Sequence, residues 1–155
     1  MILETRTYSW PDEAACAAWA QAMAAQPAVH DANIELRGTL GAGKTTFVRH
    51  LLRALGVEGR IKSPSYAIVE PYETTSLKAW HFDYYRFGDP REWEDAGFRE
   101  LYAGPGLKLS EWPEQVGALM PPPDLRLSID PDDADPQLRH VRAEALTSTG
   151  RELLP

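Results

Sequence analysis

The sequence predicts an α/β fold of three layers, with a mainly parallel central sheet and a C-terminal β-hairpin. Three observations predict this class. Helical and strand-like segments alternate in the first half of the chain, a glycine-rich turn joins a strand to an amphipathic helix, and two alternating segments near the end are joined by an acidic turn. A chain of 155 residues suits one domain, so we expect a single domain over residues 1–155.

The first half is expected to contain a helix, a strand, a glycine-rich turn and a second helix. Ser9 and Asp12 offer cap signals for the first helix, and Pro27 stops it. The second helix has apolar residues at helical spacing. In chain order, these elements are a helix ending at about Gln26, a strand over Asn33–Arg37, a turn over Gly38–Gly43 and a helix over Lys44–Leu55.

The second half is expected to consist mainly of strands. Polar or acidic turns join two pairs of them, which predicts two hairpins. The expected elements are strands Ser65–Tyr72 and Leu77–Phe82, a charged loop Gly88–Gly97 with a helical turn around Glu92, a strand Leu107–Ser110, a short helix Pro113–Met120, and strands Leu125–Ile129 and Leu138–Leu146.

Composition excludes several classes of function. Lys and Arg number 16 and Asp and Glu number 23, which gives a net charge of −7 and argues against a protein that grips nucleic acid alone. The single cysteine, Cys16, excludes an internal disulfide and a cysteine zinc site, and we expect it in the core. The longest apolar run, Ala14–Ala25, is too short to span a bilayer. We therefore expect a soluble cytoplasmic protein without a membrane partner.

The segment Gly38–Thr45 matches the pattern G-x-x-x-x-G-K-[ST] at every required position. Its glycines allow the backbone N–H groups to turn toward an anion at the start of a helix. Lys44 adds a positive charge for β- and γ-phosphates, and the Thr45 hydroxyl suits Mg²⁺. The motif predicts a P-loop NTPase-like fold. The expected nucleotide-binding residues are Gly38, Thr39, Leu40, Gly41, Ala42, Gly43, Lys44, Thr45 and Thr46.

Such a loop needs further groups for the metal and for the attacking water. Glu111 follows an apolar strand directly, and Asp83 ends the second strand of the first expected hairpin. Either acid could equally be a cap or part of a solvated turn. Ser63 and Ser65 flank Pro64 in a hydroxyl-rich segment that suits a phosphate-sensing switch, although the pattern alone favours an ordinary turn. The histidines lack metal-ligand spacing and are expected in core or solvated roles; they are His30, His50, His81 and His140.

At these residues the sequence resembles the TsaE (YjeE) family of small P-loop ATPases. Gly38–Phe47 is similar to the family pattern GxLGAGKTTF, and Lys62–Tyr66 to KSPT[FY], with Ser65 in place of the usual threonine. His81–Arg86 is similar to HFDLYR and Glu111–Pro113 to EWP. The resemblance covers nearly the whole chain, and the four motifs occur in the same order and spacing.

The resemblance implies roles for single residues. Lys44 and the loop backbone would hold the phosphates of ATP or ADP, and Thr45 and Glu111 would ligate Mg²⁺. Asp83 would serve hydrolysis by orienting water, which makes Asp83 and Lys44 the expected catalytic residues. Trp112 would support the site beside Glu111. Two further residues are expected near the nucleotide: Arg139, and Trp10 at the base pocket.

The resemblance also implies a reaction and partners. Family members supply ATP hydrolysis to the assembly that forms threonylcarbamoyladenosine next to the anticodon of tRNA. They act with TsaD and TsaB, and reach tRNA through that complex. Two alternatives stay open from the residues alone: a small-molecule P-loop kinase, and a regulatory module that binds a nucleotide without hydrolysing it.

Overall fold

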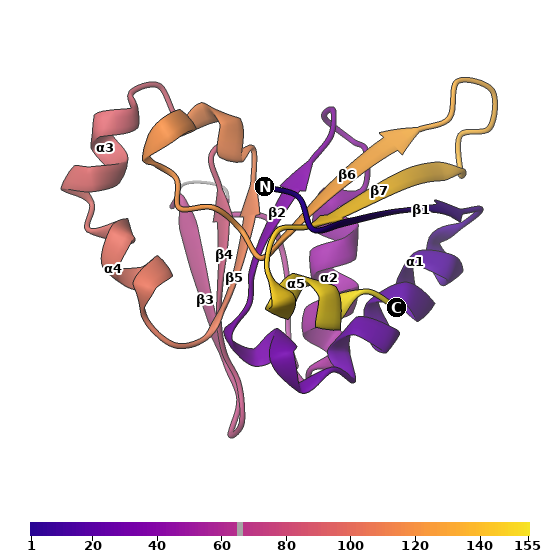
Figure 1. Cartoon of the computed structure of the whole chain (residues 1–155), viewed down its shortest axis with the longest axis horizontal. Coiled ribbons are helices and arrows are strands. Elements are labelled where there is room, and N and C mark those ends of the chain that lie inside the picture. The colour runs from indigo at the N-terminus through magenta and orange to yellow at the C-terminus, as the bar shows by residue number, and fades with distance from the viewer. Residues whose placement is uncertain (65–66) are drawn as a thin grey trace.

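The strands of the computed structural model, which describes residues 1–64 and 67–155, form one mixed sheet in the order β1-β7-β6-β2-β5-β4-β3 (Figure 1). The central pairings β4–β5, β5–β2 and β2–β6 are parallel, whereas β1–β7, β7–β6 and β3–β4 are antiparallel. The expected parallel arrangement is therefore confirmed at the centre of the sheet, and the antiparallel pairs β3–β4 and β6–β7 are the two expected hairpins. The strands are β1 (Glu4–Trp10), β2 (Asn33–Arg37), β3 (Val69–Glu73), β4 (Lys78–Asp83), β5 (Leu107–Glu111), β6 (Leu125–Pro131) and β7 (Arg139–Ala145).

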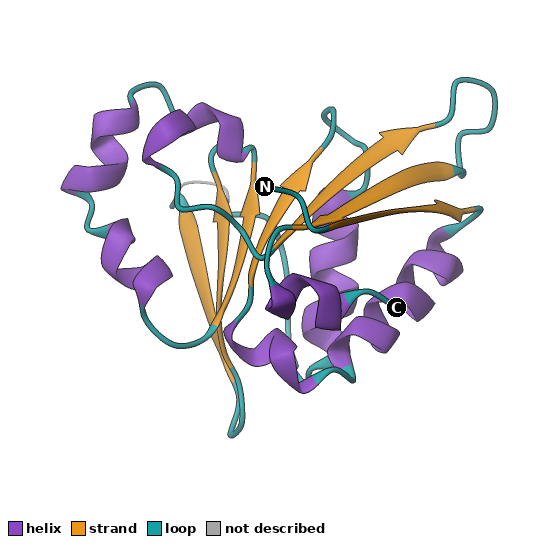
Figure 2. Ribbon diagram, viewed as in Figure 1, coloured by secondary structure: helices purple, strands orange, loops and turns teal. Residues whose placement is uncertain are grey.

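Five α-helices and three short 3-10 helices accompany these strands in the described part of the chain. Helices α1, α2 and α5 lie on one side of the sheet, and α3 and α4 lie on the other (Figure 2). The helices are α1 (Glu13–Ala24), η1 (Pro27–Asp31), α2 (Lys44–Ala54), α3 (Pro90–Asp95), α4 (Phe98–Ala103), η2 (Pro113–Gln115), η3 (Gly117–Leu119) and α5 (Ser148–Leu153).

The main core lies between the sheet and helices α1 and α2. Ile34 and Leu36 of β2 share a face with the leucines of β6, because these parallel strands pair residue by residue. Helix α2 buries one side completely, including Phe47 and Leu51. Each such side chain contributes about 1.5–3 kcal/mol of hydrophobic stabilisation. This packing fixes α2, and therefore the turn before it, against the ends of the central strands.

A second, aromatic core lies on the opposite face, over β3, β4 and β5. Phe82 packs edge-on against Phe98 of α4, with ring centroids 5.4 Å apart. The Tyr102 hydroxyl of α4 is hydrogen-bonded to Ser110 of β5. On this face the outward residues of β1, such as Thr5 and Thr7, are exposed. The three-layer arrangement therefore extends over β3–β5, and β6, β7 and β1 carry helices on one side only (Figure 2).

The N-terminal strand β1 was not among the expected elements. Residues Glu4–Trp10 pair antiparallel with β7 along their whole length. The residues alternate as a strand should, with Tyr8 and Trp10 on the inner face, and they are rich in the β-forming residues threonine and aromatics. The expected C-terminal hairpin is confirmed as β6–β7, and β1 extends it to three strands.

Several helices also differ from expectation. The expected charged loop Gly88–Gly97 contains α3, which begins after the Asp89 cap, and α4 follows it. The expected helix Pro113–Met120 is two separate 3-10 turns, because Gly117, the first residue of the second turn, adopts a positive φ of 71°. Helix α5, capped by Thr147, was not expected. These elements have six residues or fewer, so each shows little helical periodicity in the sequence.

The helices in the described residues are all too short or too polar to cross a lipid bilayer.

Gly38 provides a test of the packing that holds the turn against the sheet. Its φ is +151°, and a Cβ built there would lie 2.4 Å from the backbone oxygen of Ile129 in β6. We expect Gly38→Ala to lower the free energy of unfolding by about 3 kcal/mol, measured by urea denaturation. Gly41→Ala is the control, because its Cβ would meet nothing within 4 Å; strain alone should cost about 1 kcal/mol. Equal losses in the two variants would contradict this account.

Candidate functional site

The glycine-rich turn leads directly from β2 into α2. Gly43 is the N-cap of α2 and has a left-handed conformation with φ of 110°. The backbone N–H of Ala42 donates to the Thr39 carbonyl at 3.0 Å, which closes the turn. The helix therefore presents its unpaired N–H groups and the positive end of its dipole toward the space in front of the turn. This arrangement suits a phosphate group.

A cavity of about 320 Å³ lies in front of this turn and brings together six of the residues singled out from the sequence. Besides the turn itself, it is lined by Lys44, Thr45, Ser63, Asp83, Glu111 and Trp112, together with Tyr85. These residues lie together because β2, β5 and β4 are parallel neighbours and their carboxyl ends meet at one edge of the sheet. Ser65 lies outside the described residues.

Thr45 and Glu111 contact each other directly. The register pairs Leu36 with Glu111, which places the carboxylate beside the start of α2. The Thr45 hydroxyl lies 2.9 Å from one oxygen of Glu111 and 3.1 Å from the other. Both groups offer oxygen atoms, the ligands that Mg²⁺ prefers. The two residues expected to hold the metal thus form one oxygen-rich pair.

These donors fit a magnesium ion that is shared with a nucleotide. The described residues contain no group of three or more His, Cys, Asp or Glu side chains that could hold a metal by themselves. Mg²⁺ bound with substrate phosphates needs only one or two protein ligands, since phosphate oxygens and water complete its octahedron. A hydroxyl and a carboxylate beside a phosphate-binding turn satisfy that requirement.

Asp83 lies next to Glu111 and is held by two hydrogen bonds. The two acids are paired across β4 and β5, so their side chains share a face. The Ser63 hydroxyl donates to one oxygen of Asp83 at 2.7 Å, and the backbone N–H of Tyr85 donates to the other at 3.0 Å. Both contacts leave Asp83 free to accept a further hydrogen bond from a molecule in the cavity, because each oxygen has a second lone pair.

Lys44 is buried beneath Trp112. Its ammonium group donates to the carbonyl of Gly38 and lies 3.7 Å from the centroid of the Trp112 ring. Trp112 has a φ of 57°, unusual for a residue with a side chain. Burial lowers the pKa of the Lys44 ammonium group, and the carboxylates of Glu111, Glu114 and Asp83 oppose that shift. The ammonium group of Lys44 is thus desolvated and attracted by nearby carboxylates. A phosphate in the cavity could replace the Gly38 carbonyl as its hydrogen-bond acceptor.

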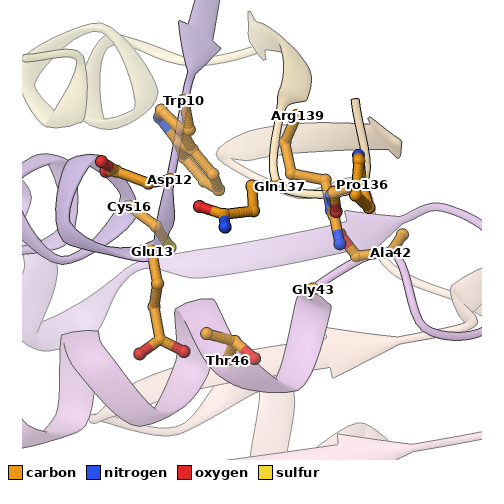
Figure 3. Close-up of a pocket in the computed structure, with 10 residues that line it drawn as sticks. All are labelled: Trp10, Asp12, Glu13, Cys16, Ala42, Gly43, Thr46, Pro136, Gln137 and Arg139. Atoms are coloured by element: carbon orange, nitrogen blue, oxygen red, sulfur yellow. The ribbon is translucent and has the colours of Figure 1, made fainter. Parts of the chain in front are cut away.

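A second cavity, of about 250 Å³, lies on the other side of the turn and contains Trp10 and Arg139 (Figure 3). It shares Ala42, Gly43 and Thr46 with the first cavity. Trp10 and Arg139 are paired across β1 and β7. The Arg139 Nε–H donates to the Ala42 carbonyl at 2.7 Å. The site expected from the sequence therefore has two adjoining spaces, with the glycine-rich turn between them.

Several residues of the site were not expected. Gln137, Asp12 and Glu13 line the second cavity, with the Gln137 amide lying between Trp10 and Arg139 (Figure 3). His81, expected in a core or solvated role, is fully buried and hydrogen-bonded to Glu111. The spacing of His81 and Asp83, two residues apart on a strand, could have indicated that both face the site.

Comparisons with known proteins identify relatives of the chain. A family model described as threonylcarbamoyl adenosine biosynthesis protein TsaE matches residues 10–141. A tRNA threonylcarbamoyladenosine biosynthesis protein TsaE from Haemophilus influenzae is 38% identical over 122 residues, which cover 78% of this chain and 75% of that relative. The protein of that name from Bacillus subtilis is 36% identical over 96 residues, 62% of this chain and 60% of the relative.

A solved structure shares the fold. The crystal structure of Bacillus subtilis YdiB has a TM-score of 0.79, at 24% sequence identity. The match covers 99% of this chain and 93% of that chain. At this level of identity, the likeness concerns the arrangement of helices and strands.

Cys16 lines the second cavity, and the reactivity of its thiol tests whether this side chain is buried. The residue is 4% exposed, as expected for a core cysteine. Burial, together with the nearby Glu13 carboxylate, raises the pKa of the Cys16 thiol to about 12. At pH 8 almost no thiolate forms, so we expect a thiol reagent such as DTNB to react at least 100-fold more slowly with the native protein than with the urea-unfolded chain. Rapid labelling of the folded protein at pH 8 would show that Cys16 is accessible.

Proposed function

The chain belongs to the TsaE family of threonylcarbamoyl adenosine biosynthesis proteins, and from this premise we propose that it is the Mg²⁺-dependent ATPase of the machinery that forms threonylcarbamoyladenosine in tRNA. The observation that carries the proposal is the single cavity in which Lys44, Thr45, Asp83 and Glu111 surround the glycine-rich turn. A cradle for phosphate, two oxygen ligands for a cation and a carboxylate for water are the parts that nucleotide hydrolysis needs.

Each residue has a defined part in this proposal. The N–H groups of Gly41–Thr45 and the ammonium group of Lys44 bind the β- and γ-phosphates, which fixes the terminal phosphorus for attack. Thr45 and Glu111 would hold Mg²⁺, which supplies positive charge that neutralises the phosphate oxygens. Asp83 accepts a hydrogen bond from the attacking water and orients it, while Ser63 and the Tyr85 N–H keep the carboxylate in place.

The second cavity suits the nucleoside. It adjoins the turn, so a base and ribose placed there would leave the triphosphate running across Gly43. The Trp10 ring is stacked on Phe47 of α2, with 14° between the two planes, and is therefore fixed. We propose that Trp10 closes the base pocket and that Arg139 approaches the nucleotide from β7.

We propose TsaD and TsaB as the partners that transfer the threonylcarbamoyl group. The net charge of −7 supports this division of labour, because the phosphate backbone of tRNA needs a basic surface that the partners would provide. ATP hydrolysis would then serve turnover of the assembly, in the cytoplasm.

Nucleotide binding can be tested at Lys44. Lys44→Ala removes the positive charge that faces the phosphates and should weaken binding of Mg·ADP by about 2 kcal/mol or more, roughly 30-fold, in calorimetric titrations. The matched control is Lys78→Ala, because Lys78 also lies over a tryptophan ring, at 5.6 Å from the Trp80 centroid, but at the far end of β4. Unchanged affinity in Lys44→Ala would exclude the phosphate role.

Hydrolysis can be tested at Asp83. Asp83→Asn keeps the shape of the side chain and removes its charge, so we expect ADP affinity within about threefold of wild type and a hydrolysis rate lower by about 10²–10⁴. Asp95→Asn, an exposed position at the end of α3, is the control. Phosphate release is measured with the chain alone and with TsaB, TsaD and tRNA, and we expect the wild-type rate to rise in the assembly.

The same assay separates the competing functions. Asp83→Asn that still supports tRNA modification would favour a regulatory nucleotide-binding module. Transfer of phosphate to a small acceptor, in place of release as free phosphate, would favour a kinase.

A further inference from the structure

His81 is a fully buried histidine on β4 whose ring contacts the side chain expected to hold the cation. We propose that His81 is a positioning residue: its Nε2–H holds the Glu111 carboxylate in the orientation in which that group, with Thr45, receives Mg²⁺. The inference rests on the proposed function and assigns a part in it to a residue that does not line the cavity. Its experiment therefore measures metal dependence separately from nucleotide binding.

The contact is a consequence of strand register. His81 is paired with Leu109 and Asp83 with Glu111 across the parallel strands β4 and β5, so His81 and Glu111 lie diagonally on one face. His81 Nε2 lies 2.6 Å from one carboxylate oxygen of Glu111, the oxygen that also lies 2.9 Å from the Thr45 hydroxyl. The histidine is 0% exposed and Glu111 is 3% exposed. The carboxylate is therefore fixed from two sides by hydrogen-bond donors on two different elements.

The chemistry of Glu111 determines which ring nitrogen of His81 donates in this contact. Glu111 as a carboxylate only accepts, so the proton lies on Nε2. The other nitrogen, Nδ1, is buried and has no hydrogen-bond partner among residues 1–64 and 67–155. Within that part of the chain, the contact with Glu111 is therefore the one hydrogen bond of the ring, and it orients the carboxylate.

Orientation matters here because Mg²⁺ requires nearly octahedral geometry. A free glutamate rotates about three side-chain bonds and must be ordered each time a cation binds. Outer hydrogen bonds that fix a metal-ligating group typically change metal affinity or activity by 10–100-fold. We therefore expect loss of the His81 hydrogen bond to raise the Mg²⁺ requirement of the protein and to leave metal-free nucleotide binding intact.

Two amide variants separate the hydrogen bond from the volume of the ring. His81→Gln places an amide nitrogen at the same number of bonds from Cα as Nε2, so it can still donate to Glu111. His81→Asn is one bond shorter and cannot reach. His140→Asn is a control, since His140 also contacts a carboxylate, Asp132 at 2.8 Å, in the exposed β6–β7 hairpin.

The measurement is a Mg²⁺ titration of fluorescent mant-ADP binding, together with mant-ADP affinity in EDTA and thermal melting of each variant. We expect the half-saturating Mg²⁺ concentration to be within about threefold of wild type in His81→Gln and His140→Asn, and about tenfold or more higher in His81→Asn. Affinity in EDTA should be the same in all of them. If His81→Asn does not fold, His81→Leu takes its place, because it fills the site without a donor.

Three results would overturn the inference. They are a Mg²⁺ requirement in His81→Asn equal to that of wild type, a requirement in His81→Gln as high as in His81→Asn, and a parallel loss of mant-ADP affinity in EDTA, which would show a structural role. Wild-type protein that binds mant-ADP with no dependence on Mg²⁺ would instead contradict the proposed function itself.

Discussion

The parallel alignment of β4, β5 and β2 beside the start of α2 is the constraint on which the site depends. Because the three strands run in one direction and in fixed register, Asp83 and Glu111 leave the sheet side by side, next to Thr45. The apolar side of α2 is buried, and the helix packs against α1 and β5. A core of ordinary hydrophobic contacts thus determines where four chemically active side chains meet, and none of them has to be ordered by a flexible loop of its own.

The electrostatics of the cavity differ from those of the whole chain. The protein carries a net charge of −7, yet the space in front of the turn faces a helix N-terminus and a desolvated ammonium group. A buried charge acts through a medium of low dielectric constant, whereas exposed acids are screened by salt beyond about 8 Å. Local attraction for an anion therefore coexists with overall repulsion. The indole of Trp112 contributes by covering Lys44 and excluding water from it.

The sequence predicted the part of this arrangement that is encoded locally. The strand Asn33–Arg37, the turn and the helix starting at Lys44 follow from a spaced motif and from helical periodicity, and the structure has them at the expected positions. Glu111 and Asp83 could be located because each stands at the end of an expected strand. Neither strand β1 nor the contact of His81 with Glu111 could be inferred from a local sequence pattern. Each depends on an interaction with residues about 30 or more positions away along the chain. The six-residue helices α3 and α5 are specified by caps and by packing, which leave little periodic pattern.

The contact between Arg139 and the Ala42 carbonyl has a consequence for the polarity of the turn. In a trans peptide the C=O and the following N–H point in opposite directions. A guanidinium group on β7 that holds the oxygen of Ala42 on its own side therefore aims the amide hydrogen of Gly43 the other way. One arginine outside the motif thereby fixes the orientation of a peptide plane within it. The N–H group of Gly43 is therefore oriented for an anion before any ligand binds.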